Sequence, residues 1–127
     1  MLRQEQRGAA VVDFVLVVVI VVPLVLGLLQ LGLVLHVRNT LTAAASEGAR
    51  YAATVDRSPG AGAERTRSQI RTALAGRFAR RVSARPVAIA GVAGVEVRVM
   101  AEVPPLGLWG PAVRLRVVGH AVEEVAP

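Results

Sequence analysis

Two histidines and a few acidic residues are the side chains most able to take part in catalysis or to bind a metal. His36 has no carboxylate near it in the sequence, and His120 precedes Glu123 and Glu124. Neither arrangement has a nucleophile, base and orienting group, or the spacing of zinc ligands. The turn at 91–94 is not a phosphate loop, because no Lys and no helix-opening Ser or Thr follows it. We therefore expect no enzyme, cofactor, metal or small-molecule substrate.

The composition points to a membrane protein. Of the 127 residues 54% are apolar but only 3% are aromatic, and there is no cysteine, which excludes disulfides and thiolate metal sites. The formal net charge is +6, and every basic residue is an arginine. This charge favours contact with anionic lipids, acidic polymers or nucleic acid without choosing among them.

An uninterrupted apolar run extends from Phe14 to Leu35, with Gln30 as its one polar side chain. As a helix it rises roughly 33 Å, enough to cross a hydrocarbon core of about 30 Å. The competing interpretation is a secretory signal peptide cleaved near Ala43–Ala45, but the run is much longer than the roughly 7 to 15 apolar residues of such a signal. We expect a single membrane-spanning helix.

Asp13 directly precedes this apolar run. A lone carboxylate in lipid costs several kcal/mol by most estimates, so an acid at this place calls for a partner. Alternatively, Asp13 lies hydrated among the lipid headgroups or caps the start of the helix. Physical reasoning leaves both possibilities open.

The residues around Asp13 form a recognisable signal. They read Arg7-Gly8-Ala9-Ala10-Val11-Val12-Asp13-Phe14. This segment resembles the class III signal of type IV pilin-like proteins, in which a prepilin peptidase cuts after the glycine on the cytoplasmic face. The resemblance implies a leader of residues 1–8, cleavage between Gly8 and Ala9, and Asp13 at the fifth position of the mature chain.

A second stretch carries the resemblance past the apolar run. It reads Val37-Arg38-Asn39-Thr40-Leu41-Thr42-Ala43-Ala44-Ala45-Ser46-Glu47-Gly48-Ala49-Arg50-Tyr51-Ala52-Ala53. It is similar to the post-membrane helix of the TadE-like family, which ends in a Glu-Gly-Ala-Arg-Tyr-Ala-Ala phrase. The chain departs from the family in having Asp13 where a glutamate is usual, and in the low aromatic content of residues 54–127.

The resemblance implies a pilus assembly component, a minor pilin or pseudopilin of a tight-adherence (Flp-type) secretion system. Its implied partners are a prepilin peptidase, a major pilin, a related minor pilin and membrane lipid. It would lie in the bacterial cytoplasmic membrane with residues beyond about 37 outside the cytoplasm, and could enter the pilus. The assembly residues are then Asp13 and Phe14, with the Asp13 carboxylate pairing with the Ala9 amine of a neighbouring subunit.

The apolar helix is expected to continue to Val55 as an amphipathic stalk, because small and apolar residues recur there at helical spacing. The narrow face is formed by Leu41, Ala45, Gly48 and Ala52. Such a face suits close packing against another helix of a bundle or filament. Packing against the protein's own domain is an equal alternative.

After a linker at 56–62 the pattern predicts a second helix, with apolar residues every four positions at Ile70, Leu74, Phe78 and Val82. Its remaining surface is basic. The arginines of this face are Arg67, Arg71, Arg77, Arg80 and Arg81. They support an alternative function, a membrane-anchored module that contacts anionic polymer or nucleic acid, although arginine without interleaved aromatics is more typical of a solvated face.

Two segments alternate with period two and are predicted to be antiparallel strands, Val95–Val99 and Val113–Val117, with a possible edge strand at Val87–Ala90. The Pro- and Gly-rich segment Pro104–Pro111 is expected to be an exposed loop with Trp109 at its tip. The fold class is therefore α+β, with a leader at 1–8, a membrane helix and stalk at 9–55, and a small domain at 56–127 in which one helix covers an antiparallel sheet.

Overall fold

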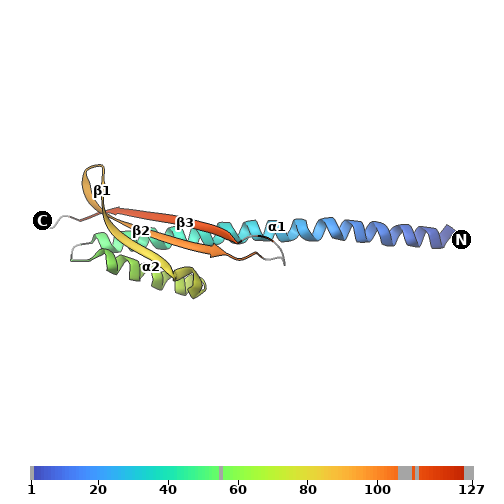
Figure 1. Cartoon of the computed structure of the whole chain (residues 1–127), viewed down its shortest axis with the longest axis horizontal. Helices are drawn as coiled ribbons and strands as arrows, with labels where there is room; N and C mark the ends of the chain where they lie inside the picture. The colour runs from blue at the N-terminus through green and yellow to red at the C-terminus, as the bar shows by residue number, and fades with distance from the viewer. Residues whose placement is uncertain (1, 55, 106–109, 111, 125–127) are drawn as a thin grey trace.

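The computed structural model describes residues 2–54, 56–105, 110 and 112–124, with side chains from residue 5 onward. The elements follow in the order α1 (Leu2–Ala53), α2 (Pro59–Ala73), the 3-10 turn η1 (Gly76–Ala79), β1 (Arg81–Ile89), β2 (Val92–Val103) and β3 (Val113–Val122). Helix α1 is a long rod, and all other elements gather around its C-terminal half (Figure 1).

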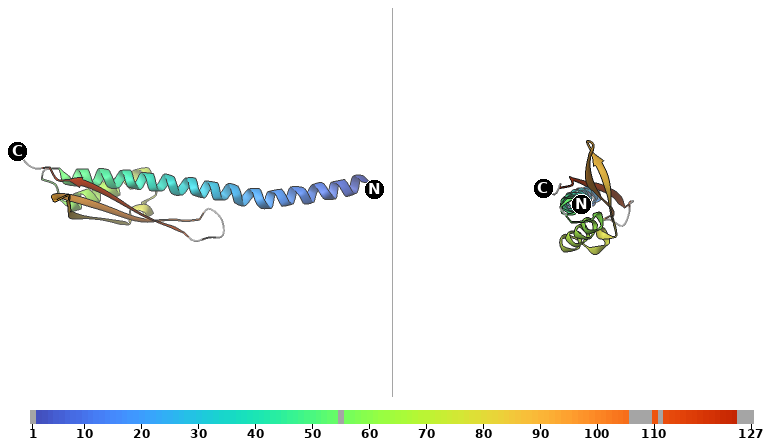
Figure 2. Two further views of the ribbon diagram at one scale, coloured as in Figure 1. Left: turned by 90° about the horizontal axis from the view of Figure 1, so that it is seen from above. Right: turned by 90° about the vertical axis from the view of Figure 1, so that its left-hand side faces the viewer.

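Helix α1 is continuous for 52 residues, including Pro23, which corresponds to about 78 Å at 1.5 Å per residue. A proline removes one backbone hydrogen bond without ending the helix, and α1 bends only gently along its length (Figure 2). The predicted processing site, Gly8 and Ala9, lies inside this helix. At its other end, the Ala53 carbonyl oxygen accepts a hydrogen bond from the Glu124 amide at 2.8 Å, so the segment that follows β3 is bonded to the last residue of α1.

Helix α2 begins earlier and ends earlier than the sequence predicts. Ser58 is the N-cap, its hydroxyl accepting a hydrogen bond from the Ala61 amide at 3.2 Å, and Pro59 opens the helix, so only the first part of the predicted linker is a connection. The predicted continuation through Val82 is wrong. The helix ends at Ala73, and Leu74 is extended. The four-residue spacing of apolar side chains persisted because the chain stays against the same core after leaving the helix.

The sheet is antiparallel with strand order β1-β2-β3. The predicted strands at 95–99 and 113–117 are confirmed as parts of the longer β2 and β3, and the edge strand β1 starts six residues before the predicted 87–90. The β1–β2 turn consists of Ala90 and Gly91, both with positive φ, 51° and 80°. It is therefore shorter than the predicted turn at 91–94, most of which belongs to β2. Trp109 lies outside the described residues.

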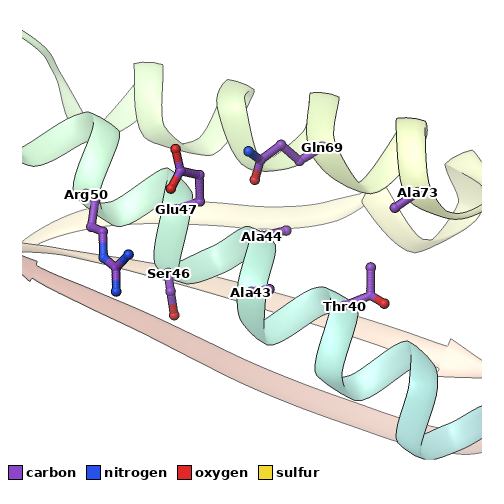
Figure 3. A pocket seen from close by; sticks show the side chains of 8 residues that line it. All are labelled: Thr40, Ala43, Ala44, Ser46, Glu47, Arg50, Gln69 and Ala73. Carbon is purple, nitrogen blue, oxygen red and sulfur yellow. The ribbon is translucent and has the colours of Figure 1, made fainter.

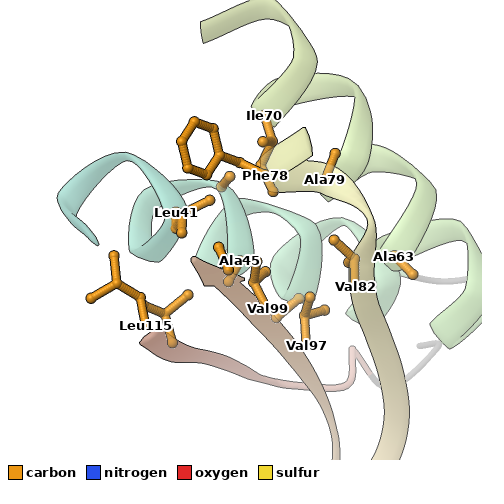
Figure 4. Close-up of a cluster of buried hydrophobic side chains, with 14 of the residues drawn as sticks. Leu41, Ala45, Ala63, Ile70, Phe78, Ala79, Val82, Val97, Val99 and Leu115 are labelled. Carbon is orange, nitrogen blue, oxygen red and sulfur yellow. The ribbon is translucent and has the colours of Figure 1, made fainter. Parts of the chain in front are cut away.

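The inner face of the sheet is covered by two helices rather than by one. The C-terminal half of α1 lies over β2 and β3 while α2 lies beside α1 and over β1 (Figures 1 and 4). The sheet contributes valines that are fully buried, Val95, Val97, Val99 and Val103. The α+β class is confirmed, and the core draws on residues from both sides of position 55.

Candidate functional site

The N-terminal half of α1 presents large apolar side chains to the surroundings over its full circumference. They extend from Val11 to Leu35, and Phe14 is 68% exposed. This is the one helix, within the part of the chain that the structure describes, that is long and apolar enough to cross a membrane. An exposed apolar surface of this size is unstable in water, so the segment needs lipid or other apolar helices around it.

Asp13 lies exposed in the first turns of this apolar surface. Within the described residues its carboxylate makes neither a hydrogen bond nor an ion pair. Ala9 is four residues earlier, which places it one helical turn away on the same side of α1. The structure thus brings the predicted cleavage point and the acidic residue onto one face, next to Phe14.

Gln30 is anchored to the domain. Its Nε2 atom donates a hydrogen bond to the Pro104 carbonyl oxygen at 3.2 Å, across 74 residues of chain. Leu33 and Val34, which follow in the same apolar run, pack against the core. The last turns of the apolar run are therefore covered on one side by the domain, and the one polar side chain of the run has a partner there.

The predicted packing face of α1 packs against other elements of the same chain. Leu41 and Ala45 are completely buried and Ala52 is 2% exposed. A Cβ at Gly48 would overlap Thr66 Oγ1 and lie 2.7 Å from the Gly62 carbonyl oxygen. The backbones of α1 and α2 therefore meet directly. Of the two alternatives that the sequence left open, these residues follow the one in which the face packs against the protein's own domain.

Gly62 completes this contact from the side of α2. A Cβ there would lie 2.6 Å from the Gly48 carbonyl oxygen. Between the helices, the buried Thr66 hydroxyl lies 2.9 Å from the Gly62 carbonyl oxygen and 3.3 Å from that of Ala44. On the opposite side of α1, Gly119 of β3 leaves room for the backbone at Ala45. Helix α1 is thus held closely on two sides.

A shallow groove of about 540 Å³ lies along the junction of α1 and α2 (Figure 3). Small side chains form most of its wall, with Glu47 and Arg50 on α1 and Gln69 on α2 as the larger polar ones. The residues of the Glu-Gly-Ala-Arg-Tyr-Ala-Ala phrase are thereby divided between the core and the groove. Its glycine and alanines pack inward, while its two charged residues line the groove.

The ring of Tyr51, in the same phrase, makes cation–π contacts with two arginines. The Arg57 guanidinium carbon lies 4.1 Å from the centre of the Tyr51 ring, and that of Arg65 lies 5.5 Å from it. Arg57 also donates a hydrogen bond to the Tyr51 hydroxyl. Cation–π contacts of this kind stabilise exposed sites by about 0.5–1 kcal/mol and here join the end of α1 to α2.

The predicted basic face separates into two groups. Arg67 and Arg71 both face Glu64, at 3.2 and 3.7 Å, and Arg67 donates a further hydrogen bond to the Val82 carbonyl oxygen at 2.9 Å. These two arginines are part of the packing of α2. The remaining three, Arg77, Arg80 and Arg81, lie beyond the end of α2 in η1 and at the start of β1.

A buried carboxylate on β2 was not anticipated from the sequence. Glu96 is 6% exposed, and its carboxylate accepts hydrogen bonds from Arg85 Nε at 2.7 Å and Arg98 Nη2 at 3.1 Å. Hydrogen bonding by Arg85, with a further contribution from Arg98, lowers the pKa of Glu96 below its ordinary value of 4.5, against a smaller opposing effect of burial. The signal was the Glu-Val-Arg alternation, which puts Glu96 and Arg98 on one face.

The predicted histidines stay apart from these clusters. His36 is on α1 and His120 on β3, and both are exposed. Within the described residues no three His, Cys, Asp or Glu side chains gather as metal ligands.

The long helix, with its exposed apolar half and its glycine contact, is also where the chain is similar to known proteins. Residues 8–50 match the family of TadE-like proteins. The family resemblance in the sequence is thereby confirmed, and the match ends within α1, before α2 and the sheet begin. No curated protein and no solved structure matches the chain. The TadE-like match indicates a role in Tad-type pilus systems, and the apolar α1 is compatible with a single membrane pass.

Substitution of Gly48 by alanine is expected to destabilise the protein by about 2 kcal/mol. Overpacking against immobile backbone costs about 1–3 kcal/mol, which exceeds the gain of up to about 1 kcal/mol from replacing a helical glycine. Calorimetric unfolding of the detergent-solubilised chain measures the change. Gly60→Ala is the control, because its Cβ meets only Ser58 Oγ at 3.8 Å. A Gly48→Ala protein as stable as this control would contradict the close contact.

Substitution of Glu96 by glutamine is expected to lower stability by about 1 kcal/mol at neutral pH, because it removes charged hydrogen-bond partners of Arg85 and Arg98. Since folding lowers the pKa of Glu96, its contribution is fully present above 4.5 and is lost as the pH falls through the lowered value. The stability difference from wild type should therefore shrink on acidification. The same unfolding measurement across pH tests this, with the exposed Glu102→Gln as control. A difference that grows towards low pH would refute it.

Proposed function

We propose that this protein is a minor pilin or pseudopilin of a tight-adherence (Flp-type) pilus system and that it acts by packing through α1, without catalytic turnover. The observation that carries the proposal is the exposed Asp13 on the apolar half of α1, which has no partner among the described residues and lies one turn from Ala9, within the segment that matches TadE-like proteins. The apolar surface supplies the affinity for lipid and for neighbouring helices, and the carboxylate supplies specificity.

Processing is the first step of the proposed function. A prepilin peptidase removes residues 1–8 on the cytoplasmic side of the membrane, leaving Ala9 as the new N-terminus. Gly8 supports this, because the helix surface at this position is open and nothing lies within 4 Å of a Cβ built there. The domain formed by α2 and the sheet then lies on the extracytoplasmic side.

Cleavage creates a positive charge where none existed. The new Ala9 amine is one turn from Asp13 on the same helix, and in an assembly the Asp13 carboxylate pairs with the N-terminal amine of a neighbouring subunit. Within an apolar bundle a charge left without its partner is strongly unfavourable, so the pair selects one axial register between subunits. Neighbouring helices then pack along the exposed apolar residues between Phe14 and Leu35.

Packing between subunits uses the N-terminal half of α1 in this proposal. The face around Leu41 and Gly48 is already occupied by α2. The alternative of an arginine face that binds nucleic acid has weaker support, because Arg67 and Arg71 are engaged with Glu64.

Gly8→Val is expected to abolish processing in host cells that have an active prepilin peptidase. The wild-type chain extracted from membranes should begin at Ala9, and the variant should keep its full N-terminus, as read by intact mass and N-terminal sequencing. Gly27→Val, equally open in the structure but inside the apolar run, is the control that should still be cut. An uncut wild-type chain would refute the pilin assignment, and a start near Ser46 would identify a secreted protein instead.

Asp13→Asn is expected to leave cleavage at Gly8 intact but to reduce association with the other pilins at least about tenfold, because the Ala9 amine loses its counter-charge. Crosslinking of processed subunits in membranes, followed by quantification of the joined species, measures the loss. Asp13→Glu restores a carboxylate and should retain most of the association. Equal association of the asparagine and wild-type proteins would exclude charge pairing as the basis of assembly.

A further inference from the structure

A second groove, of about 590 Å³, lies where η1, the start of β1, the end of β2 and the start of β3 meet. Its lining residues are Arg77, Arg80, Arg81, Met100, Ala101, Glu102, Pro104, Ala112, Arg114, Leu115 and Arg116. Arg81, Met100 and Arg116 are direct neighbours across the three strands, which places them side by side on one face of the sheet.

This groove carries a large excess of positive charge, with five arginines against one glutamate. Within the described residues Arg80, Arg81 and Arg116 form no ion pair. Glu102 pairs with Arg114 at 3.4 Å, but both side chains are well exposed, so water and salt screen that pair. Elsewhere in the domain, Glu64 and Glu96 each neutralise a pair of arginines. The charge of the groove is therefore available to a ligand.

The groove lies at the end of the domain that is nearest to the apolar half of α1. Pro104 lines it and accepts the hydrogen bond from Gln30, which belongs to the apolar run. Phe78, between Arg77 and Arg80 along the chain, packs in the core beside Leu41, six residues beyond the end of that run (Figure 4). Helix α2 runs back along α1 towards the apolar half (Figure 1).

We propose that this groove binds the headgroup of an anionic phospholipid of the membrane that α1 crosses. Guanidinium groups donate paired hydrogen bonds to phosphate oxygens, and arginines beside a membrane segment are attracted to anionic headgroups. The apolar lining from Met100, Pro104 and Leu115 suits the glycerol and upper acyl region of a lipid. The site fixes the height and tilt of the domain on the membrane surface.

The place and lining of the groove favour lipid over nucleic acid. Single-stranded nucleic acid is usually held by bases stacked on aromatic side chains along a basic groove, and among the residues that the structure describes none that lines this groove is aromatic. A headgroup is also delivered by the membrane itself, since Gln30 of the apolar run reaches a lining residue.

The test uses the full chain reconstituted in phosphatidylcholine vesicles that carry a trace of spin-labelled phosphatidylglycerol or spin-labelled phosphatidylcholine. Electron paramagnetic resonance gives the fraction of each label that is immobilised by the protein. The wild type is expected to prefer phosphatidylglycerol, and the combined variant Arg80→Gln, Arg81→Gln and Arg116→Gln is expected to lose that preference at least about fivefold at low salt.

The matched control removes three exposed arginines from the opposite end of the domain, as Arg50→Gln, Arg57→Gln and Arg65→Gln, so that the net charge changes equally. Preference retained in this control and lost in the groove variant supports the site, provided that circular dichroism shows both variants folded. Equal losses in the two variants, or a wild type without preference, overturn it. Binding of inorganic phosphate or of a single-stranded oligonucleotide that depends on the groove, with phosphatidylglycerol preference unchanged by the variant, also overturns the lipid assignment.

Discussion

The backbones of α1 and α2 touch at Gly48 and Gly62, and this contact sets how closely α2 packs beside α1. A side chain at either glycine would separate the helices and move α2 away from β1. Thr66 fills the remaining space and satisfies its hydroxyl on carbonyl oxygens of both helices. Contacts of small residues allow the dispersion forces of two backbones to act at close range, and they are sensitive to a single added methyl group.

Because this contact is made by α1 itself, one helix serves two environments. From Val11 to Leu29 it exposes apolar residues and the acid Asp13, whereas its C-terminal half supplies a large share of the two-layer α+β core. The residues that an assembly can reach and those that hold the domain together are therefore segregated along the helix. Gln30 and its bond to Pro104 mark the region where the two functions meet.

The sequence predicted the features that depend on local pattern. Each of these features lies within one helix or strand and follows from the pattern of apolar residues along it. They are the apolar run to Leu35, the stalk face at Leu41 and Gly48, and the alternation in β2 and β3. The end of α2 was missed because burial of Phe78 and Val82 continues at the same spacing after the helix stops. Arg77, Arg80 and Arg81 were predicted as part of a basic face, but the groove that they line was beyond reach, since its other residues come from strands that only the topology brings beside them.

The unbroken backbone of α1 between Asp13 and Gly48 also acts as a rotational coupling. Each residue of an α-helix turns the chain by about 100°. The number of residues between Asp13 and the domain therefore sets the direction in which the Asp13 carboxylate points, around the helix axis, relative to the sheet. Adding or removing one residue between Asp13 and Gln30 would rotate the domain relative to Asp13 by more than a quarter of a circle, while the contacts between α1 and the domain, which begin at Gln30, stay intact. The length of the helix, as much as its composition, therefore determines which side of the domain faces outward from any bundle that Asp13 joins.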